Sequence, residues 1–350
     1  MQTMIKCDVK WGEDAVKSGD PQIVLLHDAV FMPNGERFGI FDSEGRIVPA
    51  AIDFRTPQLL SKQSLAARIE LSEVTQTAPD VLYIYCGYMN PHFGHFLINT
   101  LSRFWDVAYL RGMRAKFVYH GVDIAAMYSL PFVRAIFEAM GLIREDFVTF
   151  DTPTRLSNLI VPDTSFQEQR AGFTRFRDLC LDLGRKLSPK SDAEPNERPI
   201  YYSKSRLQSG VGGFDNEAEF ETVMAGLGVD IVYPETLSLA EQIRLLNSRS
   251  LVFGTAGSFL HNTIFCESDA RFVILNPSLQ INTNFTIIDK LTGSDVTYYY
   301  PEDMQVLPSE DRKGFLTLRS IPNARARAEE LFSLAGAGTD SVPSKARLHG

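Results

Sequence analysis

The second half of the chain alternates short apolar runs with amphipathic segments of about ten residues, and this alternation constrains the fold more than any other feature. The runs that predict strands lie at 200–203, 231–233, 251–254, 272–275 and 296–300. The segments that predict helices lie between them, at 217–226, 238–247, 258–266 and 285–291. Strands separated by helices in this way build βαβ units with a parallel sheet. Such a sheet binds its ligands at the carboxyl ends of its strands.

The first half of the chain has two parts with different patterns. Residues 1–79 are irregular and β-rich. After them, a buried strand at 81–85 precedes a long helix, and a further strand and two further helices are expected at 116–120, 125–140 and 171–187. The polar stretch at 188–199 carries three prolines and predicts a linker. We therefore expect an α/β fold with two Rossmann-like domains, at 80–190 and 196–305, that face a cleft. The β-rich segment at 1–79 precedes them, and a helix and a flexible tail follow at 306–350.

Composition excludes several classes of protein. Acidic residues outnumber basic residues by 43 to 35, which disfavours nucleic acid as the main partner but leaves room for a local anion site. No apolar run reaches the roughly 18 residues of a membrane-spanning helix, and the first twenty residues lack the apolar core of a signal peptide. The four cysteines are scattered without zinc-ligand spacing. We expect a cytoplasmic protein without a transmembrane segment, and peripheral contact with the inner face of the membrane and the oligomeric state are left open.

Residues 90–111 predict an amphipathic helix with two histidines near its start. Asn90 suits the N-cap, and Pro91 suits the first helical position. At about 100° per residue, the polar side chains fall within about 80° of one another: His92, His95, Asn99, Arg103 and Asp106. The partial positive charge of a helix start favours neutral imidazole, the form that a general base needs. A solvated helix face would show the same stripe, and a metal site would need a third ligand that no spacing supplies.

Two features beside expected strand ends suit an anion. The glycine turn after 251–254 leads into a helix start where the amides of Gly257 and Ser258 are exposed. Lys204 and Arg206 follow the strand at 200–203. The turn matches neither a P-loop nor a GxGxxG motif. Glycines in such turns often serve geometry alone, and the two bases equally suit a solvated loop.

Three more residues near these strand ends are candidates. Glu235 follows the strand at 231–233, where a carboxylate can accept hydrogen bonds from ribose hydroxyls or simply charge a helix start. His261 and Asn262 stand on the first turns of the helix after the glycine turn. They face either the core or the expected cleft.

These segments in their order resemble glycosyltransferase family 61, which includes bacterial capsular-polysaccharide-type enzymes. The similarity covers roughly residues 85–280 and is carried by GHFLINTLSRFW, YYSKSRL, NEAEFE, YPETLSLAEQIRLLNSRSLVFGTAGSFLHNTIF and RFVILNP. It implies a GT-B-like fold, an inverting mechanism and a nucleotide-sugar donor. The chain resembles a divergent member, because Ala256 stands where the family often has histidine and His261 stands at a threonine position. Lys204 stands where the family has arginine after serine.

The expected function is therefore an inverting glycosyltransferase that moves a sugar from a nucleotide-sugar to a glycan or lipid-linked glycan acceptor in surface or capsular polysaccharide synthesis. No Asp-x-Asp motif occurs, so we expect no metal and no cofactor beyond the nucleotide-sugar co-substrate. His95 is the preferred base, with His92 as its rival or orienting neighbour, and Arg103 positions a substrate. The residues expected to bind the donor are Lys204, Arg206, Glu235, Gly257, Ser258, His261 and Asn262. The alternative is a degenerate GT-B scaffold or binding subunit in glycan assembly, which Ala256 motivates.

Overall fold

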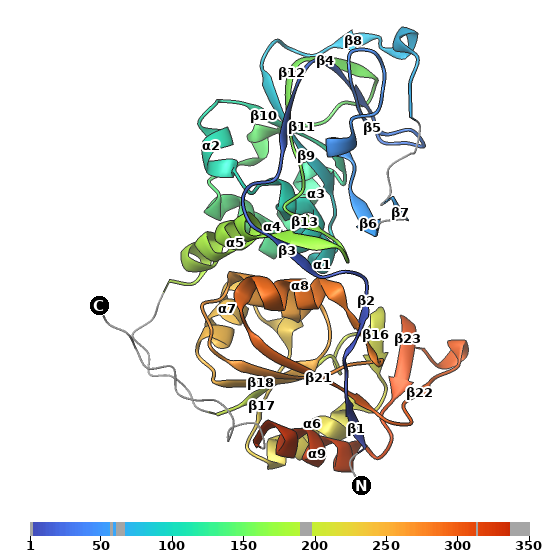
Figure 1. Cartoon of the computed structure of the whole chain (residues 1–350), viewed down its shortest axis with the longest axis vertical. Coiled ribbons are helices and arrows are strands. Elements are labelled where there is room, and N and C mark those ends of the chain that lie inside the picture. Colours follow the sequence, from blue (N-terminus) through green and yellow to red (C-terminus); the bar gives the residue numbers. More distant parts are fainter. Residues whose placement is uncertain (1–2, 57–58, 61–66, 190–197, 313, 337–350) are drawn as a thin grey trace.

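A computed structural model describes residues 3–56, 59–60, 67–189, 198–312 and 314–336. Most of the expected linker at 188–199 and of the expected tail lies outside these residues. The described chain forms two lobes, one above the other in Figure 1.

The N-terminal lobe is built on a mixed seven-stranded sheet. Its strands, in spatial order, are β11 (Phe147–Val148), β10 (Lys116–Gly121), β9 (Leu82–Met89), β12 (Thr154–Pro162), β4 (Ile23–Met32) and β5 (Gly39–Phe41), with β8 (Gln76–Thr77) beside β12. The central strand β9 is parallel to both neighbours and almost wholly buried, as a continuous apolar run favours. The helix expected at 125–140 is divided into α3 (Ile124–Ser129) and α4 (Pro131–Ala139), because Pro131 begins a new helix.

The C-terminal lobe contains the parallel sheet that the alternation predicted. Its six strands lie in the order β1 (Met4–Lys6), β21 (Asp295–Pro301), β19 (Arg271–Leu275), β18 (Leu251–Thr255), β15 (Ile200–Tyr202) and β17 (Asp230–Val232). All except β1 run parallel. Chain order reverses between β15 and β18, so their carboxyl ends form the switch point at which such sheets bind ligands.

The helices of this lobe agree closely with the sequence. They are α6 (Glu217–Gly226), α7 (Leu239–Asn247), the 3-10 helix η7 (Ser258–Phe265) and α8 (Thr283–Thr292). At the start of α7, the Ser238 hydroxyl accepts a hydrogen bond from the amide of Glu241, and the two residues form a capping box. A ninth α-helix, α9 (Ala324–Gly336), packs against α6.

The two lobes share one continuous apolar core, so the structure does not confirm an open cleft between them. Helix α5 (Thr174–Leu187) lies at the junction on the side of the N-terminal lobe, and α8 lies across the junction on the side of the C-terminal lobe (Figure 1). Leu183 of α5, Phe265 of η7 and Ile287 of α8 are buried in the same cluster. A side chain on Gly184 would collide with the carbonyl oxygen of Phe265. Only glycine therefore lets α5 approach η7 this closely.

Residues 4–17 connect the two lobes. β1 adds an antiparallel edge to the C-terminal sheet, and β2 (Val9–Trp11) pairs with β20 (Gln280–Asn282). β3 (Ala15–Lys17) then pairs with β14 (Ala171–Phe173), and β4 joins the N-terminal sheet. Strands within residues 1–79 thus belong to both lobes.

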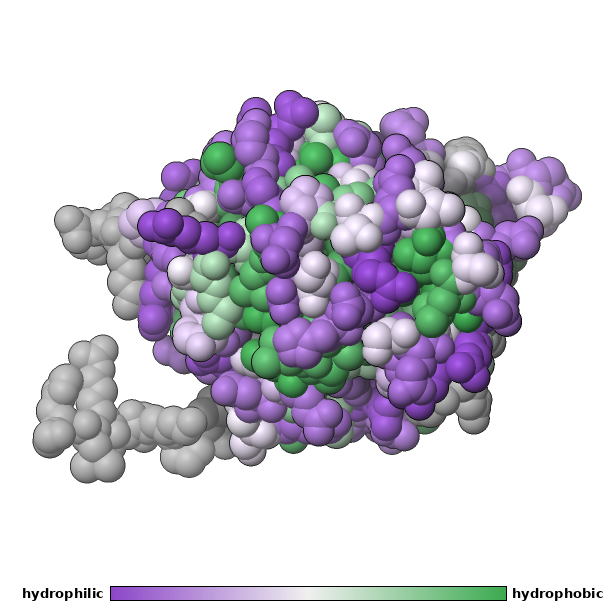
Figure 2. Space-filling view, turned by 90° about the horizontal axis from the view of Figure 1, so that it is seen from above, coloured by the Kyte–Doolittle hydropathy of each residue, from purple (hydrophilic) through white to green (hydrophobic). Residues whose placement is uncertain are grey.

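The surface of the N-terminal lobe is mainly hydrophilic, with interspersed apolar areas, when it is seen from above (Figure 2). On β4, the side chain of Leu25 is 66% exposed. In the described part of the chain, no helix has both the length and the apolar character that crossing a membrane requires.

Candidate active site at the junction of the lobes

The segment expected as one helix over 90–111 is broken into short pieces. These are α1 (Phe93–His95), a π-helical turn (Phe96–Thr100), a 3-10 turn (Leu101–Arg103) and α2 (Val107–Arg111). The N-cap is His92 rather than Asn90, whose side-chain oxygen accepts the His92 amide at 3.0 Å. The helical twist changes twice along this segment. The prediction of a single polar face is therefore wrong.

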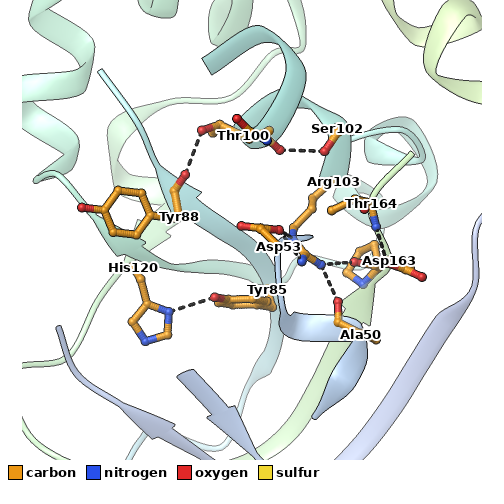
Figure 3. Close-up of polar contacts among 12 residues, drawn as sticks. Ala50, Asp53, Tyr85, Tyr88, Thr100, Ser102, Arg103, His120, Asp163 and Thr164 are labelled. Atoms are coloured by element: carbon orange, nitrogen blue, oxygen red, sulfur yellow. Dashed lines mark hydrogen bonds and ion pairs between the residues drawn. The ribbon is translucent and has the colours of Figure 1, made fainter. Parts of the chain in front are cut away.

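Arg103 is buried in the core of the N-terminal lobe, where it points toward Asp53 and Ala50 (Figure 3). Its Nε and Nη2 donate to Asp53 Oδ1 at 3.1 and 2.6 Å, and Nη1 donates to the carbonyls of Ala50 and Pro162, both at 2.7 Å. Its side chain has no solvent exposure. The expected role of Arg103 in positioning a substrate is therefore wrong, because its guanidinium is buried and donates its hydrogen bonds to groups of the protein itself. Arg103 instead ties Ala50 and Asp53 to the end of β12.

His95 lies beside a carboxylate that the sequence did not single out. Its Nδ1 is 3.1 Å from Asn99 Oδ1 and 3.5 Å from Oε1 of Glu168, a residue that directly follows β13 (Phe166–Gln167). The Glu168 side chain is only 4% exposed. A proton on Nδ1 directed at these oxygens leaves the lone pair on Nε2, the atom that a general base uses. The ring of His92 lies 5.2 Å away, measured between ring centroids.

His261 joins these residues from the other lobe. A Cβ on Gly94 would lie 3.0 Å from Ser258 Oγ and 3.3 Å from His261 Nδ1, so α1 packs directly on η7. Burial lowers the pKa of His261 to about 4, and the neighbouring Glu168 opposes this shift. The imidazole is therefore neutral at pH 7. Neither of its ring nitrogens has a hydrogen-bond partner among the described residues.

Lys204 and the glycine turn meet at the switch point, as the sequence predicted. The Lys204 ammonium donates to the carbonyl of Ala256 at 2.5 Å, and a Cβ on Gly257 would lie 2.7 Å from Nζ. Glycine at this position therefore makes room for the lysine. Burial lowers the pKa of Lys204 to about 8, against the opposing charge of Glu217. Gly257 lies against Lys204, and the next residue, Ser258, lies against Gly94 of α1. The lysine is therefore close to the histidines at the junction.

The other expected donor residues lie elsewhere. Arg206 is exposed and stacks on Tyr233, with Cζ 3.5 Å from the ring centroid, on the β17 side of β15. The structure therefore does not bring Arg206 to the glycine turn, which follows β18 on the other side. Glu235 is exposed in the turn after β17. Asn262 is buried and donates to Gln242 Oε1 of α7 at 2.7 Å, which places it in the core.

Sequence reasoning missed two charged residues near this site, Glu168 and Arg319. Glu168 stands in a short polar stretch between strands, without a motif around it. Arg319 belongs to β23 (Phe315–Ser320), and its charge contributes to the lowered pKa of Lys204. No local signal in the sequence points to either residue, because each is brought near by residues far away in the sequence: Glu168 lies beside His95, and Arg319 belongs to a strand that pairs with β16.

Comparison with known proteins shows the family to which the chain belongs. The model of the Glycosyltransferase 61 family matches residues 93–273, slightly more than half of the chain and nearly all of the candidate site. The protein is thus a glycosyltransferase. More narrowly, it belongs to glycosyltransferase family 61.

Two solved structures of the iron-containing dodecameric glycosyltransferase TibC show only weak likeness. The heptosyltransferase in complex with ADP-D-β-D-heptose has 11% identity and a TM-score of 0.24, covering 78% of this chain and 77% of that chain. The structure from enterotoxigenic E. coli H10407 has 12% identity and a TM-score of 0.22, covering 74% and 76%. At these TM-scores the likeness carries no argument. No curated protein matches the chain.

Proposed function

We propose that this family 61 enzyme is an inverting transferase that moves a sugar from a nucleotide-sugar to a hydroxyl of a glycan or lipid-linked glycan acceptor. The contact of Gly94 with Ser258 and His261 carries the proposal, because it places the histidines of one lobe next to the glycine turn of the other. The setting that we propose is surface or capsular polysaccharide synthesis in the cytoplasm, at the inner face of the membrane.

In the proposed reaction, the acceptor oxygen attacks the anomeric carbon of the sugar while the bond from that carbon to the diphosphate breaks. His95 Nε2 takes the proton of the acceptor hydroxyl. Asn99 and Glu168, beside Nδ1, orient the ring and stabilise the imidazolium that forms. Attack from the side opposite the leaving group inverts the anomeric centre, and holding both substrates in line lowers the barrier.

The departing diphosphate is stabilised by Lys204 and by the amides of Gly257 and Ser258. A cation and a helix start are both suited to charge that develops on a leaving group. This proposal assigns the neutralisation of charge to these groups rather than to a metal ion. Because β17 and β18 flank β15, Arg206 and Glu235 then lie on the side where the nucleoside would bind, with Glu235 available to the ribose hydroxyls.

A panel of nucleotide-sugars tests the function directly. The purified protein is incubated with each donor, and mass spectrometry follows the release of nucleoside diphosphate by slow hydrolysis. We expect release from one donor class. If no donor is hydrolysed and no nucleoside diphosphate raises the melting temperature, the transferase proposal fails and a scaffold in glycan assembly becomes the better account.

The pKa of Lys204 predicts how nucleotide binding depends on pH. The charged lysine binds the diphosphate, and its pKa of about 8 in the free protein means that the charge is lost as pH rises through 8. The dissociation constant for the nucleoside diphosphate should therefore increase by up to about tenfold per pH unit above 8. Calorimetry from pH 7 to 9.5 measures this slope. In Lys204→Met, binding should be weak at pH 7 and independent of pH in this range, and an equally steep slope would contradict the assignment.

A further inference from the structure

Arg319 reaches the donor side of the site from a small sheet. β23 runs parallel to β16 (Gly210–Phe214), and Arg319 lies opposite Phe214 at the carboxyl ends of both strands. The Arg319 carbonyl accepts the amide of Asp215 at 2.9 Å. Two residues later α6 begins with Glu217, whose Oε1 accepts the backbone amide of Lys204 at 3.2 Å. Arg319 and Lys204 thus both lie near the start of α6, where the backbone of Arg319 contacts Asp215 and the backbone of Lys204 contacts Glu217.

The charges at this place are unbalanced. The Arg319 side chain is half-buried, and within the described residues its guanidinium has no hydrogen bond or ion pair, although its charge is close enough to lower the pKa of Lys204. Burial lowers the pKa of Arg319 as well. Two partly desolvated cations near each other repel, and this repulsion is relieved when an anion binds between them.

The nearby carboxylate does not supply this anion. Glu217 Oε1 accepts hydrogen bonds from Tyr201 Oη at 2.8 Å and from Thr255 Oγ1 at 2.7 Å. Burial raises the pKa of Glu217, and its Oε1 is hydrogen-bonded to these hydroxyls rather than to the guanidinium. The nearby residue Gly212 has no side chain, and a Cβ there would lie 3.9 Å from Nη1. Because the Arg319 side chain is only half-buried, a ligand can reach it.

We propose that Arg319 binds the donor diphosphate together with Lys204, as a second phosphate-binding cation of the site. This rests on the proposed function. Arg319 lies outside residues 93–273, which match the family model. In this proposal Arg319 has the phosphate-binding role that the sequence suggested for Arg206, which lies on the β17 side of β15. A planar guanidinium can bind two phosphate oxygens at once, whereas the lysine acts as a point charge.

Inorganic pyrophosphate is the probe, because it carries the diphosphate without sugar or base. Calorimetry on the full chain at pH 7 measures its dissociation constant. Arg319→Gln should weaken binding by about tenfold or more, the loss of a charged hydrogen bond. The control Arg325→Gln removes one positive charge from an arginine that is 81% exposed on α9, and it should leave binding unchanged. A melting curve without ligand shows whether each variant folds.

The outcomes separate this inference from the proposed function. If Lys204→Met weakens binding and Arg319→Gln does not, Arg319 has no such role and the donor site stands. If neither variant weakens binding, or if the unaltered protein does not bind pyrophosphate, both proposals fail. An equal loss in Arg325→Gln would show a general effect of net charge and overturn the role of Arg319. Should Arg319→Gln not fold, Arg319→Lys is measured instead, and a dissociation constant equal to that of the unaltered protein would count against bidentate binding.

Discussion

Replacing His95 with alanine should slow sugar transfer by about 10²- to 10⁴-fold, the usual contribution of a general base. The acceptor hydroxyl would have to lose its proton to water, and the ring held beside Asn99 and Glu168 would be gone. Binding of the nucleoside diphosphate should stay unchanged, because Lys204 and the glycine turn are untouched. Single-turnover kinetics with the donor from the panel measure the first effect, and calorimetry measures the second.

Two other histidines make this result specific. His27 is exposed on β4, where its Nδ1 lies 3.0 Å from Asn158 Oδ1, and His27→Ala should leave the transfer rate unchanged. His92 is the rival base, and its replacement should have a smaller effect than that of His95. A large loss in His92→Ala combined with near-normal transfer in His95→Ala would exchange the two roles. Normal transfer in both variants would show that neither histidine is the general base.

Loss of Arg103 should be the most destabilising change in the N-terminal lobe. Arg103→Met removes the hydrogen bonds that the guanidinium donates to the carboxylate of Asp53 and to two carbonyls, and breaking a buried ion pair in this way costs about 3–5 kcal/mol. Urea denaturation followed by circular dichroism measures the loss. Activity should fall only as far as the folded fraction falls, because Arg103 does not contact the site.

A double variant tests the physical reason. Adding Asp53→Asn to Arg103→Met also removes the buried carboxylate charge that faced the guanidinium, and it should recover part of the lost stability. The surface variant Arg46→Met, whose side chain is 58% exposed beside Asp42, should not move the denaturation midpoint. If Arg103→Met behaves like Arg46→Met, the buried network does not stabilise the lobe.

The C-terminal lobe could be predicted from sequence because its information is local. Each apolar run and each amphipathic segment is continuous, and caps such as Ser238 and Glu241 mark where a helix begins. Parallel order then placed Lys204 and Gly257 at one edge of the sheet. The same reasoning failed for Arg206. The position of a residue after a strand predicts at which edge of the sheet it lies, but it does not predict that the side chain stacks on Tyr233.

The N-terminal lobe was less predictable because its decisive contacts are long-range. The segment at 90–111 has helical periodicity in sequence, but it is divided into short helical pieces, and Arg103 pairs with Asp53. Glu168 follows β13 and lies beside His95, from which it is far apart in the sequence. A pattern that repeats every three or four residues carries no information about partners fifty or seventy residues away.

The route of the first strand has a consequence for how the protein is made. Met4 of β1 pairs with Pro301 of β21, across almost the whole length of the described chain. During synthesis, β1 must wait without its partner until the C-terminal lobe has been translated, and late closure of so distant a contact is slow. A strand that is translated so long before its partner is therefore among the last to be incorporated. Until then, the edge of β21 is open to strands from other nascent chains.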